Sequence, residues 1–209
     1  MLPLDVCLTF FAAALVLGVA PGPDNIFVLT QSALYGSRAG LMTMLGLVTG
    51  IVFHTLAVAA GVAALVQASE LAFTVLKIIG AAYLVYLARL AFKSGAARTF
   101  EGSAPFPGYG ALYRRGVIMN STNPKVTLFF LAFLPQFTNP AYGSLPLQIA
   151  QLGVLFQVAT VIVFGIVALL GGELEKRFNE SPKGQIILNR VAGCVFLFMA
   201  VMLAVSGRN

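Results

Sequence analysis

The chain contains 209 residues, of which 59% are hydrophobic and only 10% are charged. Soluble domains carry about 25% charged residues, so this composition and a mean hydropathy of +0.92 indicate an integral membrane protein. The formal net charge of +6 does not indicate nucleic-acid binding, because the basic residues lie in connections between apolar segments rather than in one patch.

Six apolar segments are long enough to cross a hydrocarbon core of about 30 Å as α-helices. The first segment has no preceding lysine or arginine, so we interpret it as a membrane span rather than a cleaved signal peptide. Segments 93–115 and 174–183 are too polar to cross and are expected to be connections. The predicted spans are 4–34, 40–66, 71–92, 112–137, 146–170 and 185–205.

Prolines interrupt the first and fourth predicted spans. The first contains Pro21-Gly22-Pro23, and the fourth contains Pro124. Proline lacks a backbone donor and clashes with the preceding helical turn, so a helix bends or ends there. In lipid, the freed backbone groups are tolerated only where they are buried in protein or line a watery cavity. The two prolines therefore predict two broken helices at membrane depth.

The basic residues divide unevenly between the two faces that this span assignment creates. One face receives ten lysines and arginines, whereas the other receives only Lys77 and Arg208. The excess of positive charge predicts that the first face is cytoplasmic and that both chain termini lie outside. The ten residues are Arg38, Arg89, Lys93, Arg98, Arg114, Arg115, Lys176, Arg177, Lys183 and Arg190.

Short sequence matches relate the two halves of the chain. One match falls in each successive span of a half, and all three occur in the same order. Three spans per half is an odd number, so the copies must be inverted relative to each other, as in many secondary transporters. We predict a three-helix repeat at 1–93, a cytoplasmic linker at 94–110 and a second repeat at 111–209, all in one membrane domain. The matches are Pro23-Asp24 with Pro124-Lys125, Gly50 to His54 with Gly153 to Gln157, and Lys77 to Leu84 with Arg190 to Leu197.

The broken segments carry recognisable motifs. The chain has Pro21-Gly22-Pro23 in the first span and Asn123-Pro124-Lys125 in the fourth. It thereby resembles the LysE/RhtB superfamily of amino-acid exporters, of the homoserine/threonine efflux type, over essentially its whole length. The resemblance implies export of small amino acids or their derivatives from the cytoplasm. It also implies transport driven by the membrane gradient, for which proton antiport is the expected mode, a location in the bacterial inner membrane and no enzymatic activity.

Asp24 and Lys125 are the acid and the base that the span assignment places deepest. Asp24 follows Pro23 at the start of the resumed helix, where the positive helix end favours an anion. Lys125 occupies the matching position in the second repeat, where a cation is disfavoured by about 0.3–1 kcal/mol. We therefore expect an anion beside Lys125, either Asp24 itself or a substrate carboxylate.

An amino acid is a zwitterion, and this pair of charges would suit it. Lys125 with the helix cap Asn123 would bind the carboxylate, and Asp24 would bind the ammonium group. The alternative is a structural ion pair that braces the two repeats, because buried ion pairs often specify geometry. The predicted substrate-binding residues are Gly22, Pro23, Asp24, Asn25, His54, Asn123, Pro124, Lys125 and Gln157.

His54 is the only histidine in the chain and lies within the second predicted span. It could contact substrate or carry protons, because histidine titrates near neutral pH. It could equally be a neutral group that hydrogen-bonds across a helix contact, and the sequence leaves both interpretations open. The nearby Gly46-x-x-x-Gly50 spacing predicts close helix packing.

The sequence also bears on three other functions. A membrane thiol oxidoreductase needs cysteines beside the helix breaks, and Cys7 and Cys194 lie elsewhere. A metal-ion exporter needs clustered ligands that one histidine and one deep acid do not supply, so neither a metal nor a cofactor is expected. A passive channel stays open as an alternative. The expected partners are the amino acid, protons and the lipid bilayer. The oligomeric state stays open, with a homodimer as one option.

Overall fold

The computed structural model describes residues 2–20, 22–68, 70–94, 105–171, 173 and 181–205. Throughout these residues the regular structure is helical, which confirms the predicted all-α fold. The elements are α1 (Leu4–Val19), α2 (Pro23–Tyr35), α3 (Ser37–Ala68), α4 (Glu70–Lys93), α5 (Tyr109–Ser121), α6 (Pro124–Leu128), the turns η1 (Phe129–Phe133), η2 (Leu134–Phe137) and η3 (Pro140–Tyr142), α7 (Leu145–Leu169) and α9 (Pro182–Val205).

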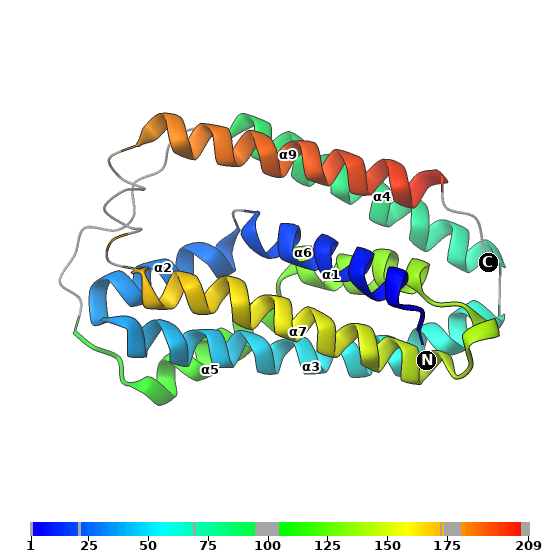
Figure 1. Cartoon of the computed structure of the whole chain (residues 1–209), viewed down its shortest axis with the longest axis horizontal. Helices are drawn as coiled ribbons and strands as arrows, with labels where there is room; N and C mark the ends of the chain where they lie inside the picture. The colour runs from blue at the N-terminus through cyan, green and yellow to red at the C-terminus, as the bar shows by residue number, and fades with distance from the viewer. Residues whose placement is uncertain are drawn as a thin grey trace.

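The long helices run along the same axis and form two unequal groups (Figure 1). Helix α3 packs against both α5 and α7, and α7 also packs against α1 and α2. Helix α4 packs mainly against α9, and this pair lies along one side of the larger group (Figure 1). The core of the larger group contains phenylalanines in tilted and edge-to-face contact, among which Phe10, Phe129 and Phe156 are almost fully buried.

Both predicted helix breaks are present. Helices α1 and α2 meet at an angle of 60°, and the α5 axis meets that of the following segment at 45°. Each resumed helix has proline in its first turn, which is Pro23 in α2 and Pro124 in α6. Proline is accepted there because the first helical N–H groups have no intrahelical partner. The prolines therefore begin the second half of each broken helix.

The second half of the fourth segment is more irregular than the sequence indicated. After α6 the chain forms a π-helical turn, η1, and then a 3₁₀ turn, η2. The change precedes Pro135, which lies in the first turn of η2 and cannot donate to the carbonyl one turn earlier. A π-turn redirects the helix without stranding backbone groups. Residues Phe129 to Phe133 thereby turn several aromatic rings into the core.

The number of membrane spans stays a prediction. Three helices are individually long and apolar enough to cross a membrane, or up to five spans if each bent pair counts as one. Helix α4 lies where the third span is predicted but is not among these candidates. The three are Ser37–Gly61 of α3, Leu145–Leu169 of α7 and Lys183–Val205 of α9.

Helices from the two halves of the chain pack closely on each other, and the inverted repeat stays a prediction. Helix α3 of the first half packs on α5 of the second half, and α7 of the second half packs on α1 and α2 of the first. The pairs α3 with α7 and α4 with α9 each join equivalent helices. The start of α1 and the last turn of α9 lie at the same end of the molecule (Figure 1), as an even number of crossings requires.

Part of the predicted polar connections lies outside the described residues. This applies to residues 95–104 of the linker and 174–180 of the later connection. The described part of the linker contributes Phe106, whose ring lies 5.4 Å from that of Tyr35 and 4.9 Å from that of Tyr109. The linker thereby contacts the ends of α2 and α5.

Candidate functional site

The two helix breaks lie against each other and line a small cavity of about 20 Å³. Both halves of the chain contribute to its wall, as the sequence predicted for broken helices that meet. A cavity of this size holds about one water molecule, so binding an amino acid would require the surrounding helices to separate. The cavity is lined by Leu17, Gly18, Gly22, Asp24, Asn25, Asn120, Asn123, Lys125, Val126, Phe156, Thr160 and Phe164.

Asp24 presents a buried carboxylate to this cavity. Its side chain is 5% exposed and lies in the first turn of α2, at the positive end of that helix. Its Oδ2 accepts a hydrogen bond from the Asn120 amide at 3.1 Å. Its Oδ1 has no hydrogen-bond partner among the described residues. One carboxylate oxygen is therefore held in place and the other is left as an acceptor.

Lys125 lies in the first turn of α6, on the other side of the cavity. Its ammonium group donates to the carbonyl oxygen of Ala20 at 2.8 Å and lies 5.8 Å from the centre of the Phe196 ring. Ala20 is the C-terminal cap of α1, where the helix dipole is negative. The compensation expected for this cation thus comes from the end of α1 and from the nearby charge of Asp24, to which Lys125 makes no direct hydrogen bond.

Asparagines satisfy further backbone groups that the breaks free. The Asn25 amide donates to the Gly18 carbonyl of α1 at 2.7 Å. The Asn123 side chain caps α6 by accepting from the backbone N–H of Lys125 at 3.0 Å, as its position before Pro124 predicted. Both side chains also line the cavity. They therefore stabilise the broken backbone and provide polar surface at the same position.

Asn120 is a site residue that the sequence reasoning missed. It is 1% exposed in the last turn of α5 and connects two predicted site residues. Its side chain donates to Asp24, and its backbone carbonyl accepts from His54 Nε2 at 3.0 Å. The sequence does contain a signal for this residue. Asn120 is a polar residue at the end of an apolar stretch, three positions before the helix cap Asn123.

Four of the predicted residues are not among those that line the cavity. His54 is buried behind Asn120, and its ring centre is 5.7 Å from that of Phe130. Gln157 is half-buried on α7. Pro23 and Pro124 are exposed and act on the backbone by starting α2 and α6. Gly22 does line the cavity, and a Cβ there would lie 3.3 Å from Lys125 Nζ.

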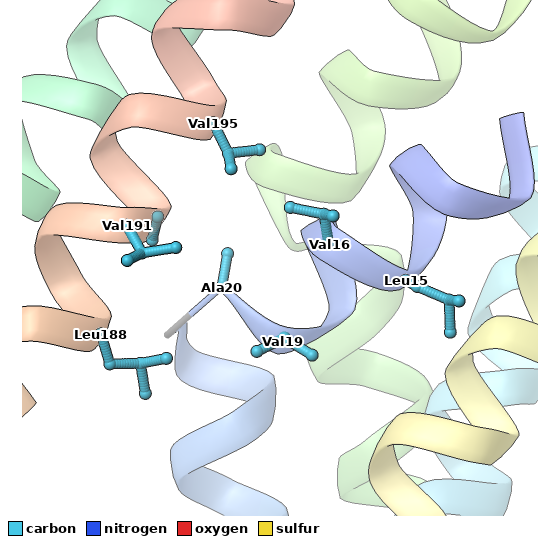
Figure 2. A pocket seen from close by; sticks show the side chains of 8 residues that line it. Leu15, Val16, Val19, Ala20, Leu188, Val191 and Val195 are labelled. Carbon is cyan, nitrogen blue, oxygen red and sulfur yellow. The ribbon is translucent and has the colours of Figure 1, made fainter. Parts of the chain in front are cut away.

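A separate apolar groove of about 230 Å³ lies between α1 and α9 (Figure 2). Figure 2 shows valine and leucine side chains from both helices on its walls. Because those side chains offer neither charge nor hydrogen-bonding groups, the groove cannot recognise the ends of a zwitterion. It is lined by Leu15, Val16, Val19, Ala20, Leu188, Val191, Ala192 and Val195.

The polar groups around the cavity are one carboxylate, one ammonium group, three amides and one hydroxyl. In the described part of the chain, no three histidine, cysteine or acidic side chains are grouped as a metal site requires. The free thiols of Cys7 and Cys194 belong to α1 and α9, and neither residue lines the cavity. What the cavity offers is a carboxylate acceptor on one side and an ammonium donor on the other.

Comparisons with known proteins agree with a transport role. The family model described as LysE type translocator matches residues 15–207. An uncharacterized membrane protein of Vibrio cholerae serotype O1 is 33% identical over 204 residues, covering 97% of this chain and 98% of that protein. The homoserine/homoserine lactone efflux protein of Salmonella typhimurium is 31% identical over 195 residues, covering 93% of this chain and 94% of the relative. The protein of the same name from Salmonella typhi is also 31% identical over 195 residues, with the same coverage. No solved structure matches the chain significantly.

These matches confirm the resemblance that the motifs indicated. The family model covers both helix breaks, and the relatives align along nearly their full length. Translocators move solutes across membranes without converting them, so the protein is a membrane transport protein and not an enzyme. The chain belongs to the LysE type translocator family.

Proposed function

We propose that this protein exports small amino acids or amino-acid derivatives from the cytoplasm, by proton antiport across the bacterial inner membrane. The observation that carries the proposal is the pair formed by Asp24 and Lys125, which line one small cavity from the two broken helices. The efflux proteins of Salmonella, with homoserine and homoserine lactone in their names, support this substrate class.

The ammonium group of the substrate would bind on the α2 side. Asp24 Oδ1 and Asn25 Oδ1 are buried acceptors without a hydrogen-bond partner among the described residues. An ammonium group is a donor of three hydrogen bonds and carries the charge that complements Asp24. Hydrogen bonds between ionised partners are roughly twice as strong as neutral ones. This side of the cavity therefore favours a protonated amine.

The carboxylate of the substrate would bind on the α6 side. Lys125 Nζ can exchange the Ala20 carbonyl for a substrate carboxylate, which is the stronger acceptor. The positive end of α6 favours the same anion. Because Lys125 caps α1 when no substrate is bound, carboxylate binding would release the end of α1. The exchange of the Ala20 carbonyl for the substrate carboxylate would therefore link substrate binding to movement of α1 at the first helix break.

Proton antiport would follow if a proton and the substrate compete for Asp24. An ionised carboxylate attracts the ammonium group, whereas a protonated one does not. Release of substrate outside would let a proton bind, and loss of that proton inside would restore the charge. The predicted inverted repeat would provide the alternating access, because broken helices in such repeats commonly form the transported site.

A counterflow screen in proteoliposomes tests the substrate class. Preloaded vesicles are offered labelled homoserine, threonine and the other common amino acids, and a subset should exchange. Export against a concentration gradient driven by an imposed pH gradient tests the antiport. A passive channel would dissipate gradients and show no uphill flux. The oligomeric state is a separate question, and cross-linking in the membrane would show whether the protein is a homodimer.

A further inference from the structure

Asn120 is held between α2 and α3 by both its side chain and its backbone. Its Nδ2 donates to Asp24 Oδ2 at 3.1 Å, and its carbonyl oxygen lies 3.0 Å from His54 Nε2. A carbonyl oxygen can only accept, so His54 Nε2 carries the proton in this contact. The three residues form a continuous buried chain from α3 through α5 to α2.

Gly50 provides the space that Asn120 occupies. A Cβ added at position 50 would lie 2.7 Å from both the Cβ and the Oδ1 of Asn120. His54 is four residues further along α3, so both residues lie on the same helical face. By contrast, a Cβ at Gly46 would meet the backbone of α5 at Tyr113 and Val117. The Gly46-x-x-x-Gly50 spacing thus combines a packing glycine with a glycine that accommodates Asn120.

The contact with Asn120 occupies one oxygen of Asp24 and helps to orient the carboxylate, which the side chain of Asn123 also approaches. An ionised carboxylate only accepts hydrogen bonds, and the amide occupies Oδ2. Oδ1 is left without a partner among the described residues. A carboxylate that is already oriented binds its ligand without the cost of ordering it. Orientation of Asp24 would therefore contribute to affinity for a charged amine.

We propose that Asn120 is the positioning residue of Asp24, and that Gly50 and His54 act on transport by holding Asn120. This inference rests on the proposed function, in which Asp24 binds the substrate ammonium group. His54 is not among the cavity-lining residues, and its ring packs beside Phe130. In this proposal His54 supports Asn120. It does not contact the substrate and does not carry protons.

The principal test is a double-mutant cycle on homoserine binding, measured by thermal-shift titration because this method reaches weak affinities. Asn120→Ala should raise the Kd for homoserine about tenfold or more in the parental protein. In an Asp24→Asn background the same substitution should change the Kd by less than about twofold, because the carboxylate that Asn120 orients is gone. Ser121→Ala is the matched control, since this neighbour on α5 does not line the cavity.

Glycine variants provide a test that retains the Asn120 amide. Gly50→Ala should displace Asn120 and raise the Kd for homoserine several-fold. Gly61→Ala makes the same change on the same helix, but its Cβ would meet no atom within 4 Å. The Gly61 variant should keep the parental Kd. Equal Kd values for the two variants would contradict the proposal even if Asn120→Ala proved too unstable to purify.

His54 variants separate support of Asn120 from proton transfer. Glutamine can still donate to the Asn120 carbonyl, so His54→Gln should keep the parental Kd and the parental pH profile of transport. The two charged groups of the site, Asp24 and Lys125, remain in place in this variant. His54→Leu removes the donor and should raise the Kd several-fold. A flattened pH profile in His54→Gln would overturn the assignment.

The Asp24→Asn and Asn120→Ala variants separate the positioning role of Asn120 from the proposed function. If Asp24→Asn keeps the parental Kd and transport rate, Asp24 does not bind the substrate and the proposed function is wrong. If Asp24→Asn raises the Kd for homoserine but Asn120→Ala does not, only the positioning role is wrong. An equal rise in Kd on adding Asn120→Ala to either background would also exclude positioning through Asp24.

Discussion

The ammonium group of Lys125 lies 2.8 Å from the carbonyl oxygen of Ala20, so a cation from the second half of the chain caps the broken helix of the first half. The contact explains how Lys125 is tolerated at the positive end of α6, because its charged group reaches the negative end of α1. A substrate carboxylate would have to displace this contact. Lys125 is thus positioned to connect recognition with a change at the first break.

The first prediction concerns the cap on α1. Lys125→Met retains an unbranched apolar stem but leaves the Ala20 carbonyl without its donor. Losing a partner of a buried carbonyl costs about 1–3 kcal/mol, so the thermal unfolding temperature should fall. Lys93→Met removes an exposed lysine from the end of α4 and is the control. Equal unfolding temperatures for the Lys125 variant and the parent would show that this cap does not contribute.

The second prediction concerns Asn25, which connects α2 to α1. Asn25→Asp keeps the shape but removes the donor to the Gly18 carbonyl. It also places a second acid beside Asp24, so stability should fall by about 1–3 kcal/mol. Chemical denaturation in detergent measures the change. Ala141→Asp, at an exposed position in η3, is the control for adding a carboxylate. A stable Asn25→Asp protein would mean that the break does not depend on this hydrogen bond.

The third prediction concerns packing between α3 and α5. A Cβ at Gly46 would meet the carbonyl oxygen of Tyr113 and other backbone atoms of α5. Backbone cannot move aside as a side chain can, so Gly46→Ala should destabilise the protein by about 1–3 kcal/mol. Gly110→Ala, whose Cβ meets no atom within 4 Å, should change stability by less than about 1 kcal/mol. Similar losses at both positions would contradict the close approach.

The sequence was sufficient to locate the broken helices and part of their contact. Proline chemistry and the helix-end preferences of Asp24, Asn123 and Lys125 are local, so they can be interpreted from spacing alone. The hydrogen bonds of Lys125 to Ala20 and of Asn120 to Asp24 join residues about a hundred positions apart. Spacing within one helix does not reveal them. The π-turn at Phe129 to Phe133 was missed because its aromatic sequence is also compatible with an ordinary helix.

The fourth prediction concerns orientation in the membrane. Ten of the lysines and arginines are assigned to one face and two to the other, so both termini should lie outside the cytoplasm. In Figure 1 the start of α1 and the last turn of α9 lie at one end, which is compatible with this orientation. Single cysteines added at either terminus of a variant without Cys7 and Cys194 should react with an impermeant reagent in intact cells. A protected C-terminus would contradict the topology.

The central claim is that Asp24 and Lys125 bind the two ends of the substrate. The decisive measurement is amino-acid uptake into inverted vesicles by the double variant Asp24→Asn with Lys125→Gln, with expression and thermal stability measured alongside. If the two charges only braced the repeats, each single variant would lose roughly 3–5 kcal/mol, and the neutral double variant would regain both stability and transport. The substrate-site account predicts a folded double variant that does not transport amino acids. A folded double variant that transports at near the parental rate would contradict it.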